Sequence, residues 1–310
     1  MSTSDYDEET VGEEEMMSYD ISNDPTITDD TGFRCPILDA YSFRCLIDFM
    51  SATLVNLPIS FTATKISALQ ADIHRTIFHR MYISTRKIAD YYFCPNLEDM
   101  TIHVNMRQFK NKIKNAQKRT TTLTLFNKLS NTQSFYAVIV TLSSTGTVII
   151  PAIRPEVQPD YSYSDYVDSK GKSLYPSLVV PVADLGRIFS QVSNSKCVYA
   201  KFVCYKRGII LRGMADGQET CVQTMGKVVN PFNSSPEMVE SQNGKPICTY
   251  FIPNRNMKPF NKIANISPLN STLEIYYSPD KPMKIVFPIG TSGKHCVFLA
   301  SIDPTSHIDV

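Results

Sequence analysis

A short basic segment occurs twice in this chain, about half the chain apart. The first copy, Met106–Asn115, reads MRQFKNKIKN, and the second copy, Met257–Asn265, reads MKPFNKIAN. Each copy follows one strand-like run of residues and precedes another. A chain that repeats a short helix in matching surroundings is expected to contain two copies of one domain.

The first copy has the spacing of a two-faced helix. Its apolar residues recur at i, i+3, i+7 and i+10, and its cations recur at a similar spacing on a different face. The apolar positions are Met106, Phe109, Ile113 and Ala116, and the basic positions are Arg107, Lys110, Lys114 and Lys118. The segment therefore predicts a helix that packs on a core with one side and presents positive charge on another.

The second copy repeats this pattern with one residue fewer. Met257, Phe260 and Ala264 are predicted to point inward, and Arg255, Lys258 and Lys262 are predicted to form the basic stripe. Pro259 fits only in the first turn of a helix, where its missing N–H is not needed. A single basic stripe could be an ordinary solvated face. Two stripes without an acid among the basic positions favour a polyanion such as duplex DNA.

The acidic residues of the chain are concentrated at its amino terminus. The chain carries 31 basic and 30 acidic residues, but residues 1–30 hold 11 of the acids and no Lys or Arg. The other 280 residues therefore hold 19 acids against 31 bases. We expect the acidic segment to be a disordered tail, because it lacks a periodic apolar pattern. It could shield the basic surface or simply add solubility.

Several classes of protein are excluded by what the sequence lacks. No run of 18 apolar residues and no signal peptide occurs, so we expect no membrane association. The eight cysteines form no Cys-x-x-Cys pair, and the five histidines form no metal-binding frame, so we expect reduced cysteines in an intracellular protein and no metal. No phosphate-binding Gly-rich loop and no nucleophile elbow occurs. We therefore expect no cofactor and no enzymatic activity.

A coarse secondary-structure pattern runs through the chain twice. Residues 42–54 and 182–193 are predicted helices, and each is followed by several short strands. A Pro- and Tyr-containing stretch, residues 143–178, reads as a connector between the two halves, and residues 226–246 read as a polar loop.

At this point the sequence resembles a known family, the DNA sliding clamps of the proliferating cell nuclear antigen (PCNA) type. The resemblance is carried by segments that match this family's strands in order and spacing: Lys65–Asp72, Leu269–Ile275 with Pro268 before it, Pro282–Phe287 and Val297–Ile302. It implies an α+β fold of two repeated clamp domains, with short helices packed on antiparallel sheets. The implied divisions are an acidic tail (1–32), a first clamp domain (33–142), the connector (143–178), a second clamp domain (179–303) and a short tail (304–310).

The resemblance implies a ring of three identical chains around duplex DNA, held by weak contacts to the phosphates. The DNA-facing candidates are the seven basic stripe residues together with Arg44 and Arg187 on the other two helices. Arg44 is expected to be offset by Asp48, and Arg187 to stand almost alone. The subunit edges would be residues 134–142 and 197–205, although their apolar alternation could equally describe inner strands.

The resemblance also implies a groove in which DNA polymerases, the clamp loader and other replication and repair proteins dock short peptides. The matching positions are His74, Val148, Ile150, Pro151, Pro282, Phe298 and Ala300, with the three from 148 to 151 assigned to the connector. The long connector and the acidic tail depart from the family pattern and suggest a divergent clamp, viral or protist in origin. Such a protein would act in the nucleus or, if viral, at a cytoplasmic replication site.

Two other interpretations stay open on the sequence alone. A clamp-fold protein could remain monomeric or join a heteromer as a polymerase or transcription cofactor. An enzyme with an unrecognised site would need titratable residues gathered in a pocket, and the sequence offers no such cluster.

Overall fold

The structure is a computed structural model that describes residues 27–37, 39–117, 121–129, 134–141, 145–153, 165–229, 236–268 and 270–303. Most of the predicted acidic tail, the tail after residue 303 and the middle of the predicted connector lie outside these residues. No helix in the described ranges is long and apolar enough to cross a membrane.

The order of elements in the first half of the chain recurs in the second half. The first half consists of β1 (Thr31–Ile37), α1 (Ala40–Met50), β2 (Asn56–Phe61), β3 (Lys65–Ala71), β4 (Ile77–Ser84), the 3₁₀ turn η1 (Thr85–Lys87), β5 (Tyr92–Phe93), β6 (Met100–Asn105), α2 (Met106–Lys112), β7 (Thr122–Lys128), β8 (Ser134–Val140) and β9 (Thr145–Pro151). The second half consists of β10 (Leu178–Pro181), α3 (Val182–Asn194), β11 (Tyr199–Tyr205), β12 (Gly208–Ala215), β13 (Gln218–Gly226), α4 (Pro236–Asn243), β14 (Cys248–Pro253), α5 (Asn254–Met257), the 3₁₀ helix η4 (Lys258–Lys262), α6 (Ile263–Ile266), β15 (Thr272–Ser278), β16 (Lys281–Ile289) and β17 (Gly293–Leu299).

The sheets repeat in the same way. The order β1-β7-β8-β9 in the five-stranded sheet recurs as β10-β15-β16-β17, and the order β4-β3-β2-β6 recurs as β13-β12-β11-β14. Two of these four-strand units join into one eight-stranded sheet, because β17 pairs antiparallel with β4 from Gly293 opposite Ile83 to Leu299 opposite Ile77. This pairing, which we call the seam, ties the second half of the chain to the first.

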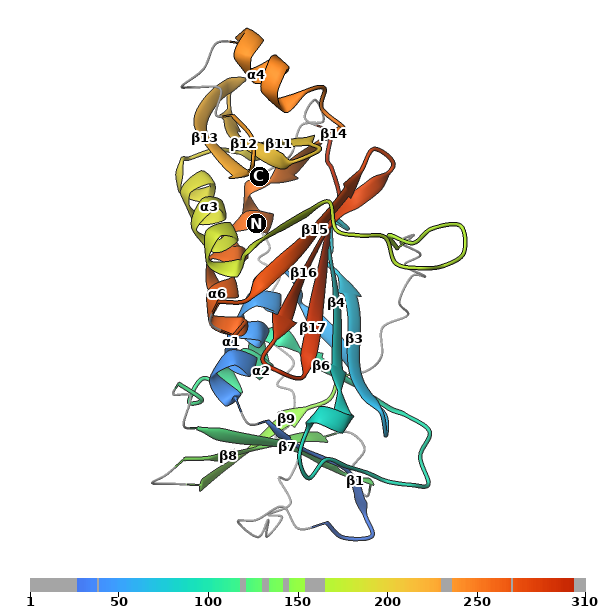
Figure 1. Cartoon of the computed structure of the whole chain (residues 1–310). Helices are drawn as coiled ribbons and strands as arrows, with labels where there is room; N and C mark the ends of the chain where they lie inside the picture. The colour runs from blue at the N-terminus through green and yellow to red at the C-terminus, as the bar shows by residue number, and fades with distance from the viewer. Residues whose placement is uncertain are drawn as a thin grey trace, which may run out of the picture.

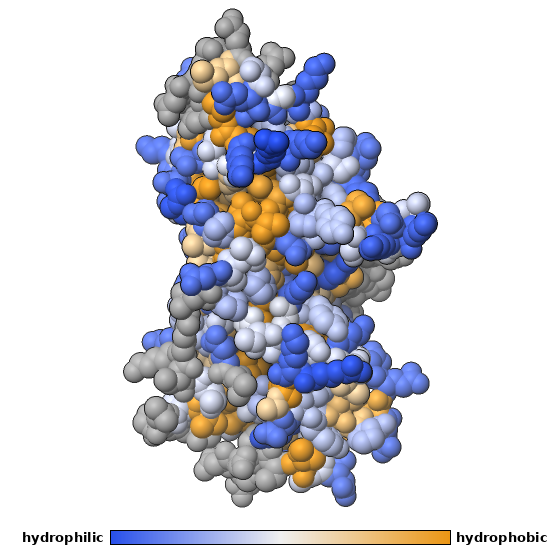
Figure 2. Space-filling view, viewed as in Figure 1, coloured by the Kyte–Doolittle hydropathy of each residue, from blue (hydrophilic) through white to orange (hydrophobic). Residues whose placement is uncertain are grey.

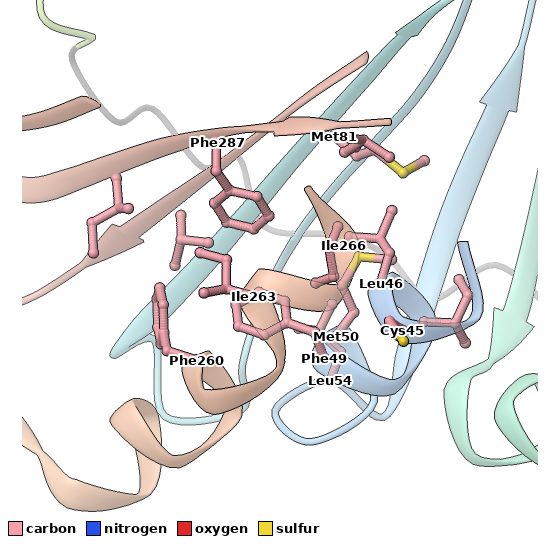
Figure 3. Close-up of a cluster of buried hydrophobic side chains, with 14 of the residues drawn as sticks. Cys45, Leu46, Phe49, Met50, Leu54, Met81, Phe260, Ile263, Ile266 and Phe287 are labelled. Atoms are coloured by element: carbon pink, nitrogen blue, oxygen red, sulfur yellow. The ribbon is translucent and has the colours of Figure 1, made fainter. Parts of the chain in front are cut away.

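Helices α1, α2, α3 and α6 lie together along one side of the eight-stranded sheet, whereas α4 lies apart from them at the top of the view (Figure 1). α1 packs against α2 and α6, and α3 packs against η4. The close-up in Figure 3 shows how the halves interlock: Phe49 of α1 lies edge-on to Phe260 of η4, with ring centroids 5.1 Å apart, and to Phe287 of β16, at 5.8 Å. Burial of such large apolar side chains is the main stabilising contribution to the core.

Two buried histidines lie on the two strands of the seam. Nε2 of His79 lies 2.8 Å from the hydroxyl of Thr53, and Nδ1 of His79 lies 3.0 Å from Nε2 of His295. Because the Thr53 hydroxyl donates to the carbonyl of Met50, a consistent arrangement has each Nε2 carrying the proton and donating along the chain. Nδ1 of His295 then remains as an acceptor without a partner among the described residues. Burial lowers the pKa of His79 to about 3 and lowers that of His295 well below its ordinary value, so both rings are neutral.

The predicted positions of several elements were wrong. β8 and β11, which correspond to the predicted subunit edges, are inner strands with a neighbour on each side. Residues 145–151, predicted as the start of the connector, form β9 at the edge of the five-stranded sheet. Strand pairing depends on residues distant in the sequence, which local apolar alternation does not identify.

Other local differences have simple causes. α1 begins at Ala40 rather than residue 42, because the Asp39 carboxylate accepts a hydrogen bond from the backbone N–H of Ser42. The predicted loop at 226–246 contains α4, and the side chain of Asn243 at its end bonds the backbone N–H and carbonyl of Val229. Of the eight cysteines, all free thiols, five are buried, and Cys221, Cys248 and Cys296 are partly exposed.

Candidate nucleic-acid interface

The first basic segment forms a helix with the predicted faces. α2 begins after Asn105, whose side-chain oxygen accepts a hydrogen bond from the backbone N–H of Gln108. The four predicted inward residues, Met106, Phe109, Ile113 and Ala116, are fully buried. Arg107 and Lys114 are exposed and Lys110 is half-buried, while Lys118 lies outside the described residues. Lys112 is also exposed, and the sequence pattern missed it because it lies between the predicted stripe positions.

The second basic segment is broken into three short pieces. α5 leads into the 3₁₀ helix η4, with Pro259 at its start, and η4 leads into α6. A 3₁₀ helix has three residues per turn, so the positions after Pro259 are rotated relative to an α-helix. Ile263 therefore fills the core and Ala264 is exposed, contrary to the predicted inward position of Ala264.

The basic residues of the second segment still face outward. Arg255 and Lys258 are exposed and Lys262 is half-buried, while Met257 and Phe260 are fully buried beneath them. The segment packs closely on α3, because a Cβ on Gly186 would lie 3.4 Å from the carbonyl oxygen of Phe260.

A carboxylate on α1 joins the two copies of the repeat. Nζ of Lys110 lies 3.6 Å from one oxygen of Asp48, and Nζ of Lys262 lies 3.9 Å from the other. The Asp48 side chain is 17% exposed and both lysine side chains are 43% exposed. The basic residues of the two copies thus meet on either side of α1, and Asp48 offsets part of their charge.

The bases on α1 and α3 have other partners than predicted. Arg44 does not pair with Asp48; its guanidinium donates to the carbonyl of Lys114 and lies over the ring of Tyr41. Arg187, predicted to stand almost alone, pairs with Asp184 at 3.5 Å. Arg187 therefore adds little free positive charge, whereas Arg44 keeps its charge without an acidic partner in the described residues.

Five candidate cations are free of acidic partners in the described part of the chain: Arg44, Arg107, Lys114, Arg255 and Lys258. They come from α1 and both copies of the repeat, on the helix side of the molecule. Guanidinium and ammonium groups spread over such a surface suit contacts with phosphates that do not depend on base sequence.

The predicted groove residues divide between two faces of the molecule. Val148 and Ile150 of β9 pack into the main core, whereas Phe298 of β17 lies with Ala71 and Phe78 in a separate cluster. The successive residues of a strand point to opposite faces, and the neighbours of Phe298, Val297 and Leu299, belong to the main core. Phe298 therefore faces away from the helices.

The remaining groove candidates lie near the ends of strands. His74 is exposed in the turn between β3 and β4, Pro151 is exposed at the end of β9, and Pro282 is partly exposed at the start of β16. The backbone N–H of Ala300 donates to the carbonyl of Thr76, which holds the end of β17 beside that turn. The structure thus brings Ala300 near the turn that carries His74 but leaves Val148 and Ile150 in the core on the opposite side of the sheets.

In the described residues no group of three or more His, Cys, Asp or Glu side chains could hold a metal ion. Among the described residues, burial raises the pKa of the Cys35 thiol to about 12 and lowers that of His79 to about 3.

Comparison with known proteins gives a clear result for structure and none for sequence. No protein-family profile and no curated protein matches the sequence. A PCNA2–PCNA3 complex from Sulfolobus tokodaii matches with a TM-score of 0.69 at 13% identity, over 86% of this chain and 98% of that chain. The PCNA of Entamoeba histolytica matches with a TM-score of 0.68 at 14% identity, over 88% and 100% of the two chains. The PCNA of Thermococcus kodakaraensis matches with a TM-score of 0.66 at 12% identity, over 87% and 100%.

These matches span both halves of the chain and nearly the whole length of each known clamp. They confirm the predicted α+β fold with its two repeated units. The low identities also agree with the predicted divergence. The chain therefore has the fold of the PCNA-type DNA sliding clamps, as a divergent representative of that fold.

Proposed function

We propose that this protein is a DNA sliding clamp that encircles duplex DNA and acts as a processivity factor for DNA polymerase. The observation that carries the proposal is the meeting of the two basic segments on the helix side, where Lys110 and Lys262 flank Asp48 and five further cations have no acidic partner in the described residues. Contacts of this kind are weak and independent of base sequence, so they permit sliding once the DNA is enclosed.

The repeat supports closure into a ring. Within the chain, β17 pairs with β4 across the seam. In the repeated sheet order β9 corresponds to β17, and β13 corresponds to β4. In the described chain, however, β9 is hydrogen-bonded only to β8, and β13 only to β12. The β9 edge of one copy can therefore pair with the β13 edge of another, as β17 pairs with β4. Such head-to-tail contacts give a closed ring when the rotation per copy is right, and three two-domain copies make the homotrimer that we propose.

The ring would serve replication and repair by tethering other proteins. We propose that DNA polymerase, a clamp loader and further proteins with short docking peptides bind the face of the eight-stranded sheet that lies away from the helices. The site of action would be the nucleus or, for a viral protein, a cytoplasmic replication site.

A second candidate is a clamp-fold accessory factor that stays monomeric or joins a heteromer. The pairing of Arg187 with Asp184, and of Lys110 and Lys262 with Asp48, favours it, because these ion pairs weaken the positive field of the helix side. The first of the similar structures is itself a complex of two different clamp subunits.

The decisive experiment is the solution mass of the full chain by light scattering after size exclusion at micromolar concentration. A mass of three times 34.9 kDa supports the homotrimer. A mass of 34.9 kDa at all concentrations contradicts the homotrimer and supports the accessory factor. The next step is retention on closed circular DNA, with loss after linearisation, because only a topological link depends on free DNA ends. The double substitution Lys114→Glu and Lys258→Glu should reduce retention without changing the mass.

A further inference from the structure

A short hairpin stands out from the face of the eight-stranded sheet that lies away from the helices. It comprises residues 165–175, is closed by a bridge between Val167 and Ser173, and turns at Gly171, whose φ of +76° suits glycine. It projects to the side of the molecule in Figure 1, and in Figure 2 this projection carries both hydrophilic and hydrophobic residues. All residues from Val167 to Tyr175 are exposed, whereas Asp165 is half-buried and Tyr166 is buried against the sheet. We call this pair the anchor.

The first anchor residue is an aspartate held by three bases, two at its carboxylate and one at its backbone carbonyl. One oxygen of Asp165 lies 2.9 Å from the Arg80 guanidinium of β4, and the other lies 2.6 Å from Nζ of Lys284 of β16. The Lys281 ammonium donates to the backbone carbonyl of Asp165 at 2.7 Å. Partial burial by itself would raise the pKa of Asp165, but the hydrogen bond from Lys284, that from the Tyr166 backbone and the nearby positive charges hold it below its ordinary value.

The second anchor residue is an aromatic ring inserted into the sheet surface. Tyr166 is 4% exposed and packs with Tyr276 and Val286, the two rings having centroids 5.4 Å apart. Its hydroxyl donates to the carbonyl of Pro282 at 2.8 Å. The ammonium of Lys281 lies over the ring, 5.3 Å from its centroid.

The same bases also cover the predicted groove residue Phe298. The guanidinium of Arg80 and the ammonium of Lys284 lie 5.3 Å and 5.7 Å from the centroid of the Phe298 ring, which is 1% exposed. The Lys284 side chain is 13% exposed. The anchor therefore fixes the cations that close this part of the outer face.

We call the surface that holds the anchor the socket. We propose that the socket is a docking site for partner peptides in which an acidic residue is followed directly by a tyrosine, and that the chain's own anchor occupies it in the free protein. The socket consists of Arg80, Tyr276, Lys281, Lys284, Val286 and Cys296. Among the described residues, Asp165 is the one acid that pairs with these three bases, so an acidic peptide complements the charge of the socket. The inference rests on the peptide docking proposed above for this face, and it adds the chemistry of the peptide and its competitor.

The competitor is favoured because it is part of the same chain. A tethered segment experiences an effective concentration of roughly millimolar or more, so a free peptide with the same two residues is outcompeted. A partner must add contacts beyond the two residues. Peptide access is therefore controlled by the strength of the Asp165 and Tyr166 contacts.

The test measures binding of a fluorescent peptide, Tyr-Ser-Asp-Tyr-Val-Asp, which is the sequence of residues 163–168, to the full chain by anisotropy. The double variant Asp165→Ala, Tyr166→Ala should bind it about tenfold or more tightly than the unaltered chain, because the tethered competitor is gone. A control peptide with Asn-Ala in place of Asp-Tyr should not bind. Adding Lys284→Glu to the double variant should abolish binding.

Equal binding to the unaltered chain and the double variant, or none to either, overturns the proposal. Circular dichroism shows whether the double variant is folded, and Tyr166→Phe, which removes only the bond to Pro282, provides a milder variant with an intermediate effect. The solution mass and retention on circular DNA are measured for the same variants. A trimer that does not bind the peptide would refute this inference but not the ring. A monomer that binds the peptide would refute the ring but not this inference.

Discussion

β4 and β13 occupy the same place in the two halves of the repeat but have different surroundings. β4 lies between β3 and β17, and its first three residues are buried. β13 is bonded only to β12 within the described chain, and its first three residues, Gln218, Glu219 and Thr220, are exposed. Within the described chain β17 covers the edge of β4, but no strand covers the equivalent edge of β13. The β13 edge therefore remains open for a second chain. The difference explains why a repeated domain favours assembly.

The largest effect is expected from a charge on the open edge. Ile149 of β9 is 39% exposed, and pairing of β9 with β13 would cover it. Ile149→Asp should shift the protein from trimer to monomer, with each contact weakened roughly tenfold to a hundredfold, because a carboxylate would lose water there. Light scattering over a dilution series measures the change. Tyr175→Asp, at a residue 90% exposed on the hairpin, is the matched control and should leave the mass unchanged. An unchanged mass for both would show that β9 is not the contact.

The seam should be sensitive to acid in a way that the open edges are not. The folded pKa values of His79 and His295 lie below that of an unfolded histidine, so the unfolded chain binds protons that the folded chain does not. Their contribution to stability is complete above pH 6.5 and is lost as pH falls toward the folded pKa values, by about 1.4 kcal/mol per pH unit for each histidine.

Urea unfolding at pH 7 and pH 5.5 measures this loss. The double substitution His79→Leu and His295→Leu should flatten the pH dependence, even if it lowers stability at both values. His74→Ala, at an exposed histidine, should keep the full dependence. β9 and β13 contain no histidine, so assembly should not follow the same curve. An unchanged slope in the double variant would assign the acid sensitivity elsewhere.

A smaller difference separates the starts of the two basic segments. The side chain of Asn105 caps α2, whereas the corresponding Pro253 offers no side-chain cap to α5. Asn105→Ala should lower the free energy of unfolding by roughly 1 kcal/mol. Asn105→Asp keeps the acceptor and should cost much less. Equal losses for the two substitutions in urea unfolding would show that capping is not the cause.

The smallest effect concerns the carboxylate between the two segments. Asp48→Asn should tighten binding of a short duplex by roughly twofold to fivefold at low salt, because Lys110 and Lys262 are released from their ion pairs with Asp48. Fluorescence anisotropy at several salt concentrations measures this change. Asp184→Asn frees only Arg187 and should have a weaker effect. Weaker duplex binding by Asp48→Asn would mean that Asp48 positions the lysines instead of shielding them.

Much of the fold could be predicted from the sequence because its signals are local. The inward positions of α2 follow from helical spacing, and Met106, Phe109 and Ile113 are fully buried as predicted. The second segment was predicted less well, because Pro259 changes the helix type and with it the phase of every later residue. The exposure of Ala264 is the result.

The candidate site could be predicted only in part. The basic stripes are a property of one segment each, but the partners of Asp48 come from residues 110 and 262, which no local pattern connects. Likewise, nothing near Phe298 in the sequence indicates that Asp165 would fix the cations that cover it.

The sequence by itself determined the repeat, the two faces of each basic segment and the clamp-type order of elements, because spacing and order act along the chain. The tertiary structure alone decided which strands are edges, which acid meets which base and which face of β17 carries Phe298. These features depend on contacts between residues far apart in the sequence, and such contacts are chosen by the packing of the whole molecule.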